Sequence, residues 1–387
     1  MSFVFSADGH IVEPADLFSR GLPPSLRQYG LRTEKRDGHM LMLVGDKITS
    51  KMALNKLKPR IGPDGESFGR GGLQGGREIP ARLLDMEHEG IDAEIVFPSL
   101  GLTAFLIENA DAELASALVY NDWLHGLLLP HPEKFVRCGI LPVRDFGNTV
   151  AELRRLSQLG FTAAMLPSLI EPNSGLPAYN SEAWDPVFAA GQEHGMVFVL
   201  HTGTGREDVR SQKGPGGAVI NYTIQACDGM HTIMHLVAGG VLDRYPGAKV
   251  CCIEGGASWL AALAERMDEV YEAHQVFVQP KLSLTPREII ARQVACSFQY
   301  DRAGIMARSV TGTGALMWGA DYPHHEGTFP RSREVLAHLF DGIDISQQDQ
   351  AAIVGGNAAR LFRIPRPGFQ AGGEPAPHEN PIQRNLQ

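Results

Sequence analysis

The chain has 387 residues, of which 43% are hydrophobic and 20% charged, a composition typical of a globular protein with a large buried core. Its formal net charge of −9 and its lack of a long Lys/Arg run argue against nucleic acid as a partner. It has no run of 18 uninterrupted apolar residues, and its N-terminus lacks the basic and apolar regions of a secretion signal. We therefore expect a cytoplasmic protein that does not bind a membrane.

The cysteines indicate a reduced protein without a thiolate metal site. There are five, an odd number, and no two are spaced as Cys-x-x-Cys. Four of them lie in apolar segments, so we interpret them as small core residues.

Eight short apolar runs rich in β-branched residues alternate with helical patterns. The apolar runs are residues 3–7, 93–97, 136–141, 162–166, 197–201, 249–253, 297–300 (the weakest) and 315–319, and the helical patterns are residues 111–129, 148–159, 181–194, 230–242 and 257–273. This alternation is typical of parallel strands joined by crossover helices. Eight strands favour a closed barrel over an open sheet, which would also need a glycine-rich phosphate fingerprint after its first strand. We predict an α/β protein with a (β/α)8 TIM-barrel fold, in which residues 1–364 form a single domain.

Three segments do not fit the alternation. Residues 30–80 form an insertion after the first strand, in which residues 40–44 and 47–49 predict a hairpin. We expect this insertion to cap the barrel mouth, and the glycine-rich residues 202–217 after the fifth strand to act as a lid. The Pro- and Gly-rich residues 365–387 predict a disordered tail.

Four potential metal ligands follow predicted strands. Asp8 and His10 flank a glycine at the end of the first strand, and residues two apart in a strand face the same side. His201 ends the fifth strand, and Asp321 lies just past the eighth. Taken singly, His201 could be a core histidine and Asp321 a turn residue. Together they provide two imidazoles and two carboxylates at one barrel mouth, a set that suits Zn or Mn and leaves a position open for water or substrate.

Several longer motifs add to these ligands. They are SADGHIVEP, RLLDMEHEGIDAEIVFPS, AYNSEAWDPVFAAGQEHGMVFVLHTG, GGVLDRYPGAKVCCIEGGASWL and WGADYPHHEGTFP. Through them, residues 3–363 resemble the amidohydrolase-2 family, the branch with aminocarboxymuconate semialdehyde decarboxylase and aromatic acid decarboxylases. The resemblance implies a homodimer that holds one divalent metal ion per chain through Asp8, His10, His201 and Asp321. Because family members often carry histidine where this chain has Asp8, the extra carboxylate shifts the preference toward Mn and leaves Zn or Mn open.

Glu254 marks a second departure from the family. Many relatives carry, after the sixth strand, a histidine that acts on the metal-bound water, whereas this chain has Glu254. Its carboxylate could serve as a general base, support a metal ligand from outside, or pair with an arginine for structural reasons. The fourth strand contains no lysine, so we expect one metal ion rather than a bridged pair.

Three further residues are candidates for the site. His324 is expected to contact substrate or orient a ligand, because the family's eighth-strand motif usually has histidine three residues after the aspartate. Arg206, in the predicted lid, could clamp a substrate carboxylate, although loop arginines are more often solvated. His235 shares a helix face with His231, and we expect His235 to reach the substrate.

Two chemistries fit this set of residues. We favour nonoxidative decarboxylation, or a related C–C bond cleavage, of a small aromatic or cyclic acid, with Asp321, Glu254 and His324 as catalytic residues. The alternative is hydrolysis of an ester, lactone or amide, in which Asp321 or Glu254 takes a proton from metal-bound water. A noncatalytic binding barrel is a third possibility that the complete ligand set argues against. A serine hydrolase would need Gly-x-Ser-x-Gly, which the stretch after the sixth strand does not supply.

Overall fold

The computed structural model of the chain describes residues 3–53, 60–61, 67–68, 74–208 and 211–364. Its central sheet is parallel and has the order β1-β8-β9-β10-β11-β12-β13-β14, with β2 also paired to β8. The strands of this sheet are β1 (Phe5–Ser6), β2 (His10–Ile11), β8 (Ala93–Pro98), β9 (Phe135–Ile140), β10 (Ala163–Pro167), β11 (Val197–His201), β12 (Lys249–Ile253), β13 (Val294–Phe298) and β14 (Leu316–Trp318). Because β1 and β2 are two halves of one interrupted strand, the sheet has the eight strands predicted for a (β/α)8 barrel.

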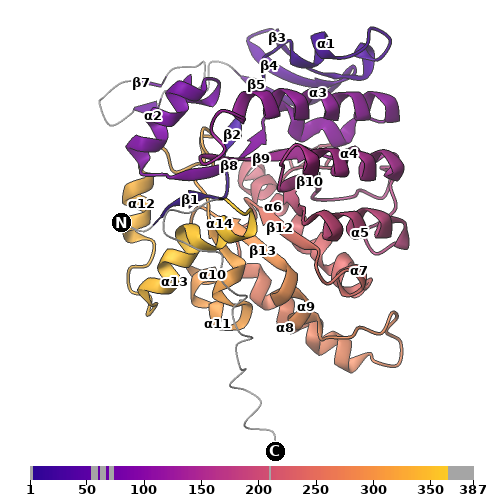
Figure 1. Cartoon of the computed structure of the whole chain (residues 1–387), viewed down its shortest axis with the longest axis vertical. Helices are drawn as coiled ribbons and strands as arrows, with labels where there is room; N and C mark the ends of the chain where they lie inside the picture. Colours follow the sequence, from indigo (N-terminus) through magenta and orange to yellow (C-terminus); the bar gives the residue numbers. More distant parts are fainter. Residues whose placement is uncertain (1–2, 54–59, 62–66, 69–73, 209–210, 365–387) are drawn as a thin grey trace, which may run out of the picture.

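Helices connect the strands and surround them on the outside (Figure 1). They are α1 (Leu17–Gly21), α2 (Ile79–Glu89), α3 (Ala110–Leu128), α4 (Phe146–Gln158), α5 (Asp185–His194), α6 (Gly217–Ala238), α7 (Val241–Arg244), α8 (Ser258–Ala273), α9 (Pro286–Gln293), α10 (Arg302–Met306), α11 (Arg308–Thr311), α12 (Ser332–His338), α13 (Gln347–Ala351) and α14 (Asn357–Leu361). Among the described residues, no helix combines the length and the apolar character needed to cross a bilayer.

The strands are buried on both faces, as parallel strands covered by helices must be. On β11, Phe198 faces outward and packs on Phe188 of α5, with ring centroids 4.8 Å apart. Four of the five cysteines are buried free thiols, in agreement with their interpretation as core residues, whereas Cys227 on α6 is exposed.

The barrel closes between its first and last strands through individual hydrogen bonds rather than a long ladder. The Ala7 N–H donates to the Trp318 carbonyl at 2.9 Å, and the Asp321 N–H donates to the Asp8 carbonyl at 3.0 Å. Gly319 makes this approach possible, because a Cβ there would lie 2.6 Å from the Cβ of Asp8. The closure therefore brings Asp8 and Asp321 together.

Several predicted elements differ from the structure in their boundaries, among them one strand and one helix. The weak seventh strand begins at Val294 rather than residue 297, because it follows the last residue of α9 directly, without a loop. The helix predicted for residues 230–242 is α6, which begins thirteen residues earlier, at Gly217. Its first half contains glycine and several β-branched residues, which have low intrinsic helix propensity.

The insertion after the first strand contains the predicted hairpin. Strands β3 (Leu31–Arg36), β4 (His39–Val44) and β5 (Lys47–Ala53) form an antiparallel sheet, and β6 (Arg60–Ile61) pairs with β7 (Ser67–Phe68). Lys47, at the hairpin turn, pairs with Glu207 of the loop after β11, with Nζ and Oε1 2.8 Å apart. That this insertion caps the mouth stays a prediction, as does the single-domain division. The tail predicted for residues 365–387 lies outside the described residues.

Candidate metal centre

Three side chains from the first and fifth barrel strands converge in the interior. Asp8 and His10 come from the interrupted first strand, and His201 is the last residue of β11. The Nε2 atoms of His10 and His201 are 3.1 Å apart, and the Asp8 Oδ1 atom lies 3.5 Å from the first and 3.7 Å from the second. All three side chains are buried. Their donor atoms are close enough to hold one metal ion.

The backbone around the two histidines assigns their tautomers. The Nδ1 atom of His10 lies 2.7 Å from the Pro98 carbonyl oxygen, and that of His201 lies 3.0 Å from the Thr202 carbonyl oxygen. A carbonyl only accepts, so each Nδ1 carries the hydrogen and donates it. In the neutral rings, both Nε2 lone pairs then face each other. Burial, followed by the charge of His324, lowers the pKa of His10 to about 3 and keeps that ring neutral.

Asp8 gives the clearest indication that a cation belongs here. Its side chain is 1% exposed, and neither carboxylate oxygen receives a hydrogen bond from the described residues. A buried carboxylate without a donor is costly, and a cation between it and the two lone pairs would remove that cost. The residues present therefore fit a divalent metal ion.

Asp321 reaches the same cluster from the end of the eighth strand. Its Oδ1 lies 3.6 Å from His10 Nε2 and 2.9 Å from the Nδ1 of His324. Its φ of 54° falls in the left-handed region, which non-glycine residues seldom occupy outside turns and functional sites. His324 also lies against His10, with ring centroids 4.0 Å apart. Asp321 and His324 thus lie on the His10 side of the cluster, and their roles as ligand and catalytic residue stay predictions.

Glu254 lies beside the cluster, directly after β12. Its φ of 64° is also left-handed, and its N–H donates to Ser297 Oγ at 3.0 Å. Its Oε2 is 4.0 Å from His201 Nδ1, and the side chain is 16% exposed. Burial, then the charges of Asp321 and Asp8, raises the pKa of Glu254 well above its usual value. Within the described part of the chain Glu254 forms no ion pair with an arginine, which argues against a purely structural role.

The two predicted substrate-binding residues have partners of their own. Arg206 forms a bidentate pair with Asp228 of α6, with nitrogen to oxygen distances of 2.6 and 2.5 Å. His235 Nδ1 lies 3.3 Å from Asn180 Oδ1, and its ring packs at a tilt against that of His231, with ring centroids 4.5 Å apart. These contacts join Arg206 and His235 to residues outside the metal cluster, so their substrate roles stay predictions.

Three residues that the sequence did not single out also line this region. Glu326 offers a carboxylate oxygen within 4.8 Å of oxygens from Glu254 and Asp321. Tyr222, in the unpredicted first half of α6, has its hydroxyl 3.3 Å from Glu326. Phe97 packs on His201 with ring centroids 4.9 Å apart. Glu326 could have been found from its position, because it follows Asp321 by five residues in the same loop.

A parallel (β/α)8 barrel with histidines and carboxylates gathered at the carboxyl ends of its strands defines a class of metal-dependent enzymes with hydrolase-type barrels. Residues 74–364, three quarters of the chain, match the Amidohydrolase family, and the chain belongs to this family.

Three known proteins show which members it resembles. The 2-amino-3-carboxymuconate-6-semialdehyde decarboxylase of Dictyostelium discoideum is 22% identical over 288 residues, which cover 73% of this chain and 76% of that protein. An amidohydrolase from Mycobacterium avium subsp. paratuberculosis K-10 has a similar structure, with a TM-score of 0.78, 21% identity and coverage of 93% of this chain and 99% of the other. A dihydroxybenzoic acid decarboxylase from Polaromonas sp. JS666, with bound manganese and the inhibitor 2-nitroresorcinol, gives a TM-score of 0.63, 18% identity and coverage of 95% and 98%. These structural likenesses are evidence of a shared fold.

Proposed function

We propose that this protein is a metal-dependent nonoxidative decarboxylase of a small aromatic or cyclic acid. In this proposal Asp8, His10, His201 and Asp321 hold one divalent ion. The observation that carries it is the convergence of the His10 and His201 lone pairs on the donor-free carboxylate of Asp8. The choice of decarboxylation is supported by the two similar proteins that are named as decarboxylases.

The chemistry can be divided among the residues. A bound ion would act as a Lewis acid on oxygens of the substrate. In the reaction the bond between a ring carbon and the carboxyl carbon breaks, carbon dioxide leaves, and the ring carbon takes a proton. Glu254 is placed to hold that proton, since its carboxyl lies at the edge of the cluster and is partly exposed. His324 fixes the orientation of Asp321 through their 2.9 Å contact.

Zn and Mn both remain part of the proposal. The two imidazoles are ligands typical of Zn, whereas the carboxylates of Asp8 and Asp321 favour a harder cation such as Mn. Manganese is supported by its presence in the similar dihydroxybenzoic acid decarboxylase. Metal content by mass spectrometry on the purified protein would distinguish them.

The first experiment compares metal content in wild type, His201→Ala and the matched control His231→Ala. His231 is an exposed histidine of α6 outside the cluster. We expect about one ion per chain in wild type and in the control, and a large loss in His201→Ala, because each ligand supplies much of the affinity. Two ions per chain in wild type, or none, would contradict the mononuclear site.

The second experiment tests the reaction. Wild type loaded with Mn²⁺ or Zn²⁺ is incubated with dihydroxybenzoic and related aromatic acids, and carbon dioxide and the ring product are quantified. We expect Glu254→Gln to reduce kcat about 10² to 10⁴-fold with unchanged metal content, the range for loss of a general acid or base. No carbon dioxide from any acid, but incorporation of ¹⁸O from labelled water into the product of an ester, lactone or amide, would support the hydrolase alternative instead.

We also propose that the protein is a cytoplasmic homodimer. Dimerisation is supported by exposed apolar side chains, among them Val219 and Tyr222 on α6 and Val276 and Phe277 after α8. The cytoplasm is supported by the free thiols. Light scattering coupled to size exclusion would test the dimer, and a single-chain mass at micromolar concentration would contradict it.

A further inference from the structure

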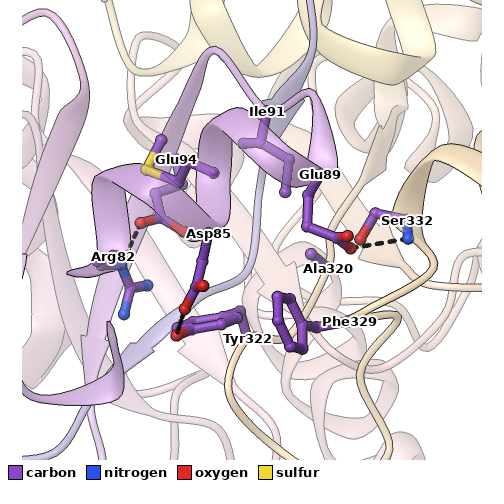
Figure 2. A pocket seen from close by; sticks show the side chains of 10 residues that line it. Arg82, Asp85, Glu89, Ile91, Glu94, Ala320, Tyr322, Phe329 and Ser332 are labelled. Carbon is purple, nitrogen blue, oxygen red and sulfur yellow. Dashed lines mark hydrogen bonds and ion pairs between the residues drawn. The ribbon is translucent and has the colours of Figure 1, made fainter. Parts of the chain in front are cut away.

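A buried ion pair lies on the outer side of the barrel wall, directly behind the segment that carries Asp8 and His10. Arg82 of α2 and Glu94 of β8 are both almost completely buried, and the Arg82 Nε donates to the Glu94 carboxylate (Figure 2). Charged side chains are seldom buried without a specific reason, because removing them from water is expensive. The proposed chemistry uses neither of them.

Arg82 contacts both segments that supply ligands. Its Nη1 donates to the backbone carbonyl of His10 at 2.6 Å, and its guanidinium lies over the ring of Tyr322, 4.9 Å from the centroid. Tyr322 directly follows the ligand Asp321, and its hydroxyl donates to Asp85, which lies on α2 like Arg82. Helix α2 is therefore attached through two side chains to the ligand-bearing ends of the first and eighth strands.

These attachments occur at the seam where the barrel has few strand-to-strand hydrogen bonds. The last strand, β14, has three residues, and past its end the described chain meets the first strand at the bridge between Gly9 and Tyr322 and through the hydrogen bond from the Asp321 N–H to the Asp8 carbonyl. The His10 N–H donates to the Tyr322 carbonyl at 2.6 Å there. The spacing of Asp8, His10 and Asp321 thus depends on these few backbone contacts and on the side chains packed behind them.

Gly9 allows the Arg82–Glu94 ion pair to lie close to the backbone of the first strand. Because successive residues of a strand face opposite sides, Asp8 and His10 point toward the barrel interior, and Gly9 faces the Arg82–Glu94 pair. A Cβ at Gly9 would lie 2.8 Å from Glu94 Oε2 and 2.9 Å from Arg82 Nη2. The absent side chain leaves room for the guanidinium and the carboxylate beside the backbone between Asp8 and His10.

We propose that Arg82, held by Glu94, is a positioning residue that fixes the distance between the ligands of the first strand and Asp321. This inference rests on the metal site of the proposed function, but not on decarboxylation. It assigns to Arg82 an effect on metal affinity in addition to any effect on stability.

Isothermal titration calorimetry tests this proposal: Mn²⁺ is titrated into chelator-treated full-length protein, and its affinity is measured. Arg82→Lys keeps the charge but loses the planar fork that reaches Glu94 and His10 together. We expect it to weaken Mn²⁺ binding about 10 to 100-fold, the effect typical of residues that support metal ligands. Glu94→Gln keeps the shape and loses the charge, and should also weaken binding while keeping the fold.

The matched control is Arg155→Lys. Arg155 forms a bidentate pair with Glu152 of α4, at 2.7 and 2.8 Å, and contacts none of the metal-ligating segments. We expect Arg155→Lys to lower the melting temperature with wild-type Mn²⁺ affinity. Equal loss of affinity in Arg155→Lys would show a general effect of destabilisation and overturn the proposal.

Three other results would also bear on these proposals. If Arg82→Lys does not fold, Glu94→Gln alone decides, and wild-type affinity in that variant overturns the positioning role. Wild-type protein that binds neither Mn²⁺ nor Zn²⁺ would overturn the metal site and this inference together. Tight Mn²⁺ binding without release of carbon dioxide from any acid would overturn only the decarboxylase proposal.

Discussion

At the scale of single residues, the site is built from groups whose local states are energetically unfavourable. Asp8 is buried without a donor, and Glu254 and Asp321 adopt left-handed backbone conformations. Such conformations cost of order 1–3 kcal/mol each and persist where the surrounding structure imposes them. A protein selected only for stability would replace these residues, so their presence together is itself an argument for function.

Replacing Asp8 should therefore have opposite effects on stability and on metal binding. In Asp8→Asn the amide can donate to the Nε2 of His10 or His201, so a buried charge without a donor disappears. We expect the metal-free variant to be more stable than metal-free wild type by about 1–3 kcal/mol, and to lose the stabilisation by Mn²⁺. Thermal unfolding with chelator and with Mn²⁺ measures both, and a metal-free variant less stable than wild type would contradict the account of Asp8.

Glu113 should give the unfolding free energy a pH dependence. This buried carboxylate of α3 accepts hydrogen bonds from the N–H groups of Val143 and Arg144 at 2.9 and 2.8 Å, and burial raises its pKa from 4.5 to about 7. Between these values the folded protein holds a proton that the unfolded chain releases. Its contribution to stability is therefore present below pH 4.5 and is lost as the pH rises through about 7, at no more than about 1.4 kcal/mol per pH unit.

The test is urea denaturation of wild type and Glu113→Gln between pH 4.5 and 8. Since Gln cannot titrate, the stability of the variant relative to wild type should increase as the pH rises across this window. If the free energies of unfolding of wild type and variant change with pH in parallel, the pKa of Glu113 is the same in the folded and the unfolded chain, which would contradict this prediction.

At the scale of elements, the loops after the strands carry the site, and contacts between them shape its rim. Tyr222 on the first half of α6 reaches Glu326 in the loop after β14, while Lys47 of the insertion reaches Glu207 in the loop after β11. The sequence predicted the loops and the hairpin, because strand and turn signals are local. It did not predict the first half of α6, which has weak helix formers; the pair of Asp228, at the middle of this helix, with Arg206 ties the helix to the loop after β11.

The Lys47–Glu207 pair should couple the insertion to the loop after β11 only weakly. Both side chains are about half exposed, and exposed ion pairs contribute about 0.2–1 kcal/mol. A double-mutant cycle with Lys47→Ala and Glu207→Ala should give a coupling within that range that falls between 0.05 and 0.5 M salt. A coupling that salt does not change would indicate contacts other than this ion pair.

At the scale of the whole molecule, a metal ion should stabilise the closed barrel. The candidate ligands come from the first, fifth and eighth strands, so one ion would connect segments 313 positions apart in the chain, from Asp8 to Asp321. A ligand that binds only the folded state at 100 times its Kd adds about 2.7 kcal/mol to the unfolding free energy.

We therefore expect chelator treatment to lower the melting temperature by several degrees, and Mn²⁺ to restore it. Far-ultraviolet circular dichroism at 25 °C should stay unchanged, because the hydrophobic core does not depend on the ion. An identical melting temperature with and without chelator, in protein shown to lose its metal, would contradict a site that spans the barrel.

The sequence by itself indicated the fold class, the eight strands and the four candidate ligands, because local patterns mark them: alternating apolar runs, polar residues where those runs end, and the motifs of the family resemblance. The tertiary structure decided which residues from distant segments of the chain contact one another. It brings the Nε2 atoms of His10 and His201 to 3.1 Å from each other and pairs Arg206 with Asp228. It also packs Arg82 against the outer side of Gly9. No local pattern encodes such contacts, since closing the barrel is what brings their partners together.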